Sequence, residues 1–456
     1  MNSKTKTIII VWSAIFLFLS HPQDARCLEG ALGSFDVNTL GRAYAYFAAN
    51  PRVGREEKNT SAETRIDLAY SQTLFRRLSF RLSSRFQADT DKRSEDAIDG
   101  LEDNGQHRRM FDLHEGFIEY RLGWFDFYCG RRILAWGKSD HFNPADRINP
   151  KDYTDFLDNE KMGVFLGGFK LSFTRNSQLE ACYIPSFTRS RIYLSGSRWA
   201  AFDRDMQIEE EIPEIESYAS RYSLYLKNLD IDMIYMRRAE DLPTLLLNPR
   251  PLHINSSDLF VAPGMMIAPA PRLAPAGFFG SGSAGLVEKY RKMNLMAIEW
   301  STTVADRVEL HGGATYHDMD RKEVYGRFVQ YLLGLNYTFD GWFCKDVKVS
   351  SEYMNCAEID KPVNEDLLIL DFVRIFENSL FSRLSSTLTS SSSFEIGNLW
   401  SFEKTSNDIL RLEYQYSPYD VLEFKLGLDF IWGNDESVFR QFEKNDRTWI
   451  SIRYVF

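Results

Sequence analysis

The chain has 456 residues, of which 26% are charged and 14% aromatic, and its formal net charge is −10 at pH 7. This composition excludes a helical membrane protein, because each spanning helix needs about 20 predominantly apolar residues. The many aromatic residues argue against long disorder, and the acidic balance argues against a nucleic-acid partner, which would bind a basic face.

The first 27 residues are expected to be a cleaved signal peptide. Two lysines precede an apolar run over residues 8–19, and Ala25-Arg26-Cys27 resembles a small-x-small cleavage site. A charged head, a short apolar core and a small-residue exit are typical of secretory signals. A membrane anchor is the less favoured alternative, because the run is shorter than a spanning helix. Residues 28–456 are then expected to form one exported domain.

Apolar and polar residues alternate with a period of two in segment after segment. In residues 78–86, Leu78, Phe80 and Leu82 share one face, and arginines and serines share the other. The same alternation recurs in residues 65–70, 115–122, 331–339, 422–430 and 448–456. Alternation over this length predicts strands with one apolar face. Counting such segments gives about 16 to 18 strands.

The sequences between the predicted strands fall into two kinds. Residues 339–342 and 417–420 contain Asp, Gly or Pro and predict tight turns, whereas residues 89–109 and 189–216 predict long polar loops. Short turns at one rim and long loops at the other are typical of outer-membrane barrels. A closed barrel also pairs every backbone amide in lipid. We therefore predict an all-β fold, a single transmembrane antiparallel β-barrel of about 16–18 strands in a Gram-negative outer membrane. A soluble exported β protein is the alternative.

The sequence ends on an alternating strand. Ile452, Tyr454 and Phe456 share one face. A Phe at the end of such a strand resembles the C-terminal signal read by the barrel-assembly machinery. We expect this machinery and membrane lipid as partners. A homo-oligomer and the partners of an export complex stay open.

One strand carries a family resemblance. Residues 125–137 read Phe-Asp-Phe-Tyr-Cys-Gly-Arg-Arg-Ile-Leu-Ala-Trp-Gly, which resembles the GRQ-x-x-x-WG strand of a porin-like family of exported barrels of unknown function. Residues 114–120 resemble the strand before it, and residues 430–456 contain pieces similar to the family's last hairpin. Arg132 stands where Gln is usual. The resemblance implies an outer-membrane barrel and names no substrate.

The alternation also predicts which charged residues face the lumen. The predicted lumen residues are Arg77, Arg81, Arg85, Asp67, Glu115, Glu119 and Arg121. Opposed basic and acidic side chains could select solutes by charge. The alternative is that these side chains only pair with one another.

Residues 136–152 are predicted to form a rigid loop folded into the lumen, because two Asn-Pro steps favour extended geometry. The loop residues of interest are Trp136, Lys138, Asp140, Asp146 and Asp152. The three aspartates recur every six residues. Calcium binding by their oxygens is a less favoured alternative, and no metal or cofactor is expected.

Residues 261–286 are apolar and contain four prolines between positions 263 and 275. Such a segment is too interrupted for a strand or a spanning helix. It needs shelter in the lumen, against a partner or around an apolar ligand, and it suggests a hydrophobic cargo. A Cys344–Cys356 bridge is also left open.

The predicted function is a porin-like channel that passes a small solute through a polar lumen narrowed by inward loops. The alternative is a plugged barrel acting as a component of an export complex or in handling lipids or hydrophobic compounds. No nucleophile or metal signature points to catalysis, so no enzyme is expected. Hydrolysis that depends on His311 would be the mark of a barrel enzyme.

Overall fold

The computed structural model describes most of the chain between residues 33 and 455. The described residues are 33–48, 59–74, 76–91, 93–94, 103–193, 197–200, 208–247, 286–304, 307–319, 326–339, 341, 345–360, 368–402, 407–434 and 437–455. The predicted signal peptide, the apolar segment 261–285, Cys344 and Phe456 lie outside them.

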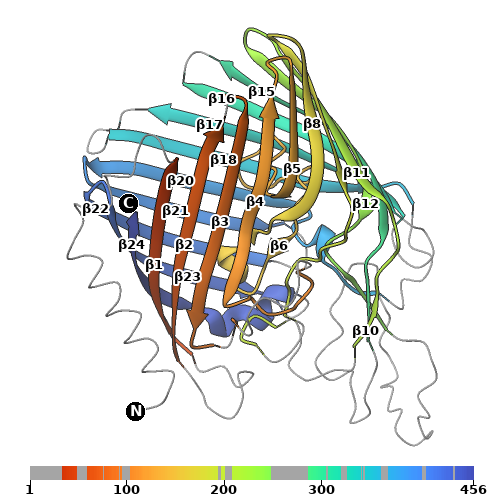
Figure 1. Ribbon diagram of the computed structural model, residues 1–456. Coiled ribbons are helices and arrows are strands. Elements are labelled where there is room, and N and C mark those ends of the chain that lie inside the picture. The colour runs from red at the N-terminus through yellow and green to blue at the C-terminus, as the bar shows by residue number, and fades with distance from the viewer. Residues whose placement is uncertain are drawn as a thin grey trace, which may run out of the picture.

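Eighteen antiparallel strands form one closed barrel (Figure 1). The strands are β1 (Ser34–Tyr46), β2 (Thr60–Leu74), β3 (Leu78–Asp89), β4 (Phe111–Arg121), β5 (Phe125–Arg132), β8 (Val164–Thr174), β9 (Ser177–Ile184), β11 (Ser217–Tyr225), β12 (Leu229–Ala239), β15 (Lys292–Val304), β16 (Val308–Met319), β17 (Arg327–Phe339), β18 (Lys345–Glu358), β20 (Ser379–Thr389), β21 (Ser392–Ser401), β22 (Asn407–Tyr419), β23 (Leu422–Gly433) and β24 (Arg447–Val455). Each strand pairs with its sequence neighbours in this series, and β1 pairs with β24 to close the ring. The predicted fold class is confirmed.

Tight turns gather at one rim and long connections at the other. Strand pairs such as β8–β9 and β22–β23 are joined by two residues between the strand ends, whereas β5 and β8 are separated by residues 133–163. The turn predicted at residues 417–420 lies slightly later, because β22 continues to Tyr419. Pro418 falls where the β22–β23 register shifts. This is a position that tolerates a residue without a backbone N–H.

The two faces of the wall differ as the alternation predicts. Outward side chains such as Leu333, Leu426 and Ile450 are large, apolar and exposed. Inward ones such as Glu352 and Asp429 are charged and fully buried. The exposed aromatic residues near strand ends are Phe35, Phe47, Trp124, Phe173, Phe402 and Tyr419. An apolar band flanked by aromatic rings is the surface of a barrel that spans a lipid bilayer.

Smaller elements lie within and beyond the barrel. Strands β6 (Lys151–Asp152) and β7 (Glu160–Lys161) pair with each other and flank the short helix η2 (Phe156–Asp158). Four strands form a separate sheet, and Figure 1 shows β10 beyond one end of the barrel. These strands are β10 (Ile208–Glu211), β14 (Leu286–Lys289), β13 (Thr244–Leu247) and β19 (Leu368–Asp371). Helix η4 (Phe372–Arg374) follows β19, and η5 (Val438–Asn445) links β23 to β24. None of the described helices is long and apolar enough to cross a membrane.

Candidate functional site inside the barrel

One segment, residues 133–163 between β5 and β8, crosses the barrel interior; we call it the inward segment. Near its start the Trp136 indole N–H donates to the Glu180 carboxylate on β9 at 3.1 Å. The Lys138 ammonium lies 3.5 Å from Asp232 on β12. These contacts hold the start of the segment against one arc of the wall.

The next part of the inward segment is held by a single carboxylate on β18. Glu352 accepts backbone N–H groups from Asp140 at 2.6 Å, His141 at 3.0 Å and Phe142 at 2.8 Å. His311 on β16 lies 2.8 Å from the same carboxylate, through its Nε2. Hydrogen bonds to an ionised acceptor are stronger than neutral ones. Glu352 therefore anchors the segment to a second part of the wall, at β18.

The middle of the inward segment returns to β12. The Arg238 guanidinium donates to the Ile148 carbonyl at 2.6 Å and also to the Arg147 carbonyl. The Arg147 side chain lies 3.7 Å from Glu240, which directly follows β12. Burial raises the pKa of Glu240 to about 7, and neighbouring Asp241 adds to the rise while Arg147 opposes it. Through Arg147, the segment therefore contacts a buried carboxyl group whose protonation changes near neutral pH.

Asp155 ties the inward segment to β24. It accepts from Arg447 at 2.6 Å and from Arg93 at 3.2 Å. Arg447 is fully buried and also donates to Asp429 on β23 at 2.7 Å. Asp158 also accepts from Arg447 at 3.2 Å, so three carboxylates hold one buried guanidinium between the wall and the segment.

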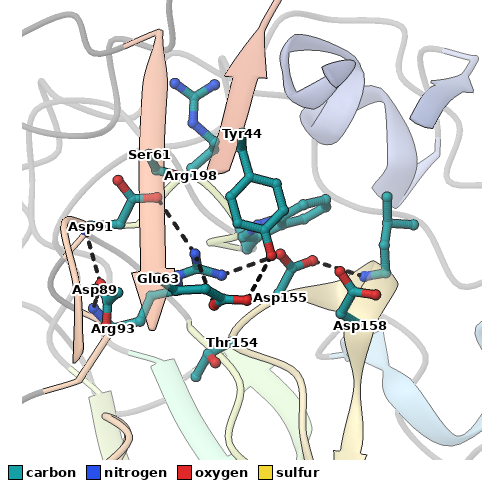
Figure 2. Close-up of polar contacts among 12 residues, drawn as sticks. Tyr44, Ser61, Glu63, Asp89, Asp91, Arg93, Thr154, Asp155, Asp158 and Arg198 are labelled. Atoms are coloured by element: carbon teal, nitrogen blue, oxygen red, sulfur yellow. Dashed lines mark hydrogen bonds and ion pairs between the residues drawn. The ribbon is translucent and has the colours of Figure 1, made fainter. Parts of the chain in front are cut away.

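Asp158 extends this cluster to β1 and β22. Its carboxylate accepts from Arg42 at 2.9 Å and from Arg411 at 3.1 Å. Burial by itself would raise the pKa of Asp158, but Arg411 and Arg42 outweigh it and hold that pKa far below its usual range. Figure 2 shows the Tyr44 hydroxyl turned toward this group, where it donates to Glu63 at 2.9 Å.

The end of the inward segment reaches β2 and β3. Glu160 accepts from Arg65 at 2.5 Å and from Arg85 at 2.7 Å. The two guanidinium groups overcome the opposite effect of burial and lower the pKa of Glu160 to about 2. From Trp136 to Glu160, the segment contacts wall strands distributed around the ring. These strands are β9, β12, β17, β18, β22, β24, β1, β2 and β3.

Apolar side chains fill the space beside these ion pairs. Trp136, Ile148 and Phe439 are almost completely buried inside the barrel and belong to one hydrophobic cluster. A barrel of this size ordinarily encloses water. The inward segment and these apolar side chains, which together we call the partition, occupy part of this interior.

Six of the predicted lumen residues pair with one another, either across neighbouring strands or along β4. Arg85 donates to Asp67 at 2.7 Å, and Arg81 lies 3.4 Å from Glu115. Glu119 accepts from Arg121 at 2.8 Å. The structure thus brings each of these basic residues to an acidic one.

Arg77 is the exception among the predicted lumen residues. It lies exposed in the turn between β2 and β3, since β3 begins only at Leu78. Its backbone carbonyl accepts from the Arg121 N–H of β4 at 2.8 Å. Its predicted inward direction stays a prediction.

The three aspartates of the predicted inward loop have separate partners. Asp140 accepts from Asn336 at 2.9 Å, Asp146 pairs with Lys161, and Asp152 accepts from Arg108 at 2.9 Å. No group of three metal-binding side chains occurs among the described residues. The six-residue spacing therefore corresponds to three separate contacts of the segment.

The Gly-Arg-Arg-x-x-x-Trp-Gly strand has a steric explanation. Gly130 has φ +132°, and a Cβ there would lie 2.3 Å from the Gly116 carbonyl oxygen. Gly137 has φ +108°, and a Cβ there would lie 2.3 Å from the Asn143 side chain. Both positions favour glycine. The second lets the chain turn directly after Trp136 and enter the barrel.

A cavity of about 110 Å³ lies beside the inward segment. Rings from the segment, from residues 197–200 and from the 372–376 and 438–445 connections surround it. They belong to Phe142, Tyr153, Phe156, Trp199, Phe372, Phe376 and Phe442. The polar lining residues include Asn143, Asp146, Arg147, Lys151, Asp241 and Gln330. This cavity is the candidate site for a small ligand.

The buried arginines Arg93 and Arg447 and the partly buried Arg42 and Arg411 were not part of the sequence prediction. Alternation does indicate an inward direction for Arg42 and Arg447, which share a face with Tyr44 and Trp449 respectively. It contains no information on partners that lie hundreds of residues away, such as Arg447 and Asp155.

The two described residues of the predicted assembly signal lie on the closing strand. Ile452 pairs with Gly41 and Tyr454 with Thr39, both on β1. Their strand therefore closes the barrel, while their recognition by assembly machinery stays a prediction.

No protein-family model matches the chain, and no curated protein matches it. Solved structures do resemble it. One is Wzi, an outer-membrane protein involved in group 1 capsule assembly in Escherichia coli and described as a carbohydrate-binding β-barrel. It shows a TM-score of 0.49 and 8% identity, over 94% of this chain and 86% of that one.

Two mutants of the porin of Rhodopseudomonas blastica also match, each over 93% of this chain and 100% of theirs. Their TM-scores are 0.39 and 0.35, with identities of 10% and 9%. Such identities concern the fold alone. The closed antiparallel ring and its apolar outer face define the class of this protein as an 18-stranded antiparallel β-barrel with the surface of a membrane-spanning barrel.

Proposed function

We propose that this protein is an outer-membrane barrel closed by its own inward segment, acting in the handling of a hydrophobic compound rather than as a permanently open pore. The observation that supports this is the path of residues 133–163. Their polar side chains and backbone contact strands around the ring, from Glu180 on β9 to Arg42 on β1. A segment held on all sides leaves little room for free diffusion.

The proposal includes export through the signal peptide, assembly guided by the C-terminal strand, and membership of the family with the GRQ-x-x-x-WG strand. It includes no catalytic step. The apolar composition of residues 261–286 supports a hydrophobic cargo, since an apolar stretch of this length needs cover from water.

The second candidate is the passive channel. The observation in its favour is the pairing of charged side chains near the tight-turn rim, where Arg81 and Arg121 are half exposed or more. A polar mouth of this kind is what a solute channel needs. The two candidates differ in whether water connects the two rims.

Single-channel conductance of refolded protein in a planar bilayer tests the proposal. Wild type should give no stable open steps. Asp155→Ala combined with Asp158→Ala removes the anchors to Arg447 and Arg42 and should produce frequent openings. Heat-dependent gel mobility verifies that each variant is folded.

Glu413→Gln is the matched control, because Glu413 pairs with Lys425 within the wall at 2.8 Å and lies outside the inward segment. It should stay as silent as wild type. Stable steps from folded wild type would reject the closed barrel and favour the passive channel.

A further inference from the structure

The cavity beside the inward segment has the properties of a ligand site. Neighbouring rings form a continuous aromatic lining: Phe156 lies 6.1 Å from Phe376 and 6.0 Å from Phe442, and Trp199 lies 5.5 Å from Phe442 between ring centroids. Phe142 lies 5.8 Å from Phe376. Aromatic faces and edges at these separations favour another flat ring among them.

Two polar atoms of lining residues lack hydrogen-bond partners among the residues the structure describes. They are the indole Nε1 of Trp199, a residue 4% exposed, and the side-chain oxygen of Asn143. Buried polar groups are nearly always paired, so each such atom asks for an explanation. The Trp199 N–H needs an acceptor, and the Asn143 oxygen needs a donor. A hydroxyl group can satisfy either of them.

The charged lining residues balance one another. Arg147 and Lys151 are basic, and Asp146 and Asp241 are acidic. Arg147 already faces Glu240 at 3.7 Å, and Asp146 is paired with Lys161. The site therefore suits a neutral ligand rather than an ion.

The volume limits the ligand to one ring. A cavity of about 110 Å³ is somewhat smaller than the ~150 Å³ apolar cavity that accepts benzene in another protein. A hexose is about twice as large in atom count as benzene and carries polar groups on all its edges. Half-buried Tyr153 and Ile192 in the lining leave one side of the cavity incompletely covered.

We propose that this cavity binds a single neutral aromatic ring bearing a hydroxyl group, that is, a simple phenol. The ring lies among the phenylalanines, and the hydroxyl oxygen accepts from the Trp199 N–H. This rests on the proposed function, since it names a class for the hydrophobic compound. Binding is measured without a bilayer, so its failure is separate from any conductance result.

The test is ¹⁹F NMR titration of the purified full chain in detergent with 4-fluorophenol. Saturable 1:1 binding is expected, with fluorobenzene at least roughly ten-fold weaker because it lacks the hydroxyl group. Methyl glucoside should not compete. Absence of saturable phenol binding to folded protein, equal binding of fluorobenzene, or competition by the glucoside would each overturn the proposal.

Variants locate the site. Trp199→Phe keeps a ring but removes the N–H, and should weaken 4-fluorophenol roughly five- to ten-fold. Trp449→Phe is the matched control, because Trp449 is also buried with an unpartnered Nε1 among the described residues but lies outside this cavity. It should bind like wild type. Leu242→Phe fills the cavity and should abolish binding; if that variant does not fold, the tryptophan pair decides.

Equal affinity in Trp199→Phe and wild type would place the phenol elsewhere and reject the assignment.

Discussion

At the scale of single residues, Gly130 combines two constraints. Its φ of +132° and the 2.3 Å approach of a Cβ to the Gly116 carbonyl act together. We expect Gly130→Ala to lower the free energy of unfolding by roughly 1–3 kcal/mol, the cost of holding a side chain in a strained conformation. Urea titration of the refolded barrel measures it.

Gly167→Ala is the control on neighbouring strand β8. A Cβ at Gly167 would meet nothing within 4 Å, and its backbone lies outside the left-handed region. The same chemical change should therefore leave the urea midpoint nearly unchanged. Equal losses at both positions would show that the steric account of Gly130 is wrong.

Buried and exposed arginines should differ sharply in their contribution to stability. Arg447 is 0% exposed and lies between Asp155 and Asp429, so Arg447→Met leaves two buried carboxylates without their common partner. Such a loss costs roughly 3–5 kcal/mol. Arg121 is 62% exposed beside Glu119, and Arg121→Met should cost less than about 1 kcal/mol. Urea unfolding of both variants compares them, and similar losses would contradict the buried cluster's role.

At the scale of elements, the inward segment should respond to pH through Glu240. Its pKa is about 7 in the folded protein and about 4.3 in an unfolded chain. Between pH 4 and pH 7 the Glu240 carboxyl is ionised in the unfolded chain but still holds its proton in the folded protein. The free energy of unfolding therefore falls as pH rises from about 4 to about 7.

Glu240→Gln removes this titration. The variant should gain stability over wild type at pH 8 by about 1–3 kcal/mol, as the shift implies, and the gain should vanish near pH 4. The loss of the Arg147 contact offsets part of it. Urea unfolding at pH 4, 6 and 8 gives the comparison. A pH-independent difference between the two proteins would argue against Glu240 as the titrating group.

Elements differ in how far the sequence predicts them. Wall strands such as β3 and β23 were predictable, because one face meets lipid and the other does not, and this repeats every second residue. Residues 368–374 form β19 and then η4. Strand ends were less predictable, as at the turn predicted for residues 417–420, where β22 continues to Tyr419.

The partition was less predictable than the wall. The entry of residues 136–152 into the barrel followed from their prolines and asparagines. The contacts that hold the segment did not, because Glu352 and Asp140 are 212 positions apart and no local pattern relates them. Asp140, Asp146 and Asp152, which recur every six residues, each have a different partner.

At the scale of the whole molecule, successive side chains along each strand point alternately to the barrel interior and to its outer surface. Leu426 and Ile450 are paired neighbours on β23 and β24, and they are 50% and 56% exposed on the outer surface. If that surface faces lipid, Leu426→Arg should destabilise the barrel in phospholipid vesicles by roughly 2–4 kcal/mol near the bilayer midplane. If the outer surface faced water, the same substitution would change the free energy of unfolding little, because an exposed arginine stays hydrated.

Lys425→Arg is the inward-facing control one residue away, and it keeps the charge beside Glu413. It should be nearly neutral in vesicles, so the difference between the two variants reports the face and not the strand. Urea unfolding of both in vesicles, compared with an unsubstituted barrel, provides the measurement. Because the penalty depends on depth in the bilayer, Leu422→Arg, on the same face at the end of β23, should cost less than Leu426→Arg. Equal losses in the free energy of unfolding at both positions would contradict a lipid-facing band. They would therefore also contradict the membrane location of the whole barrel.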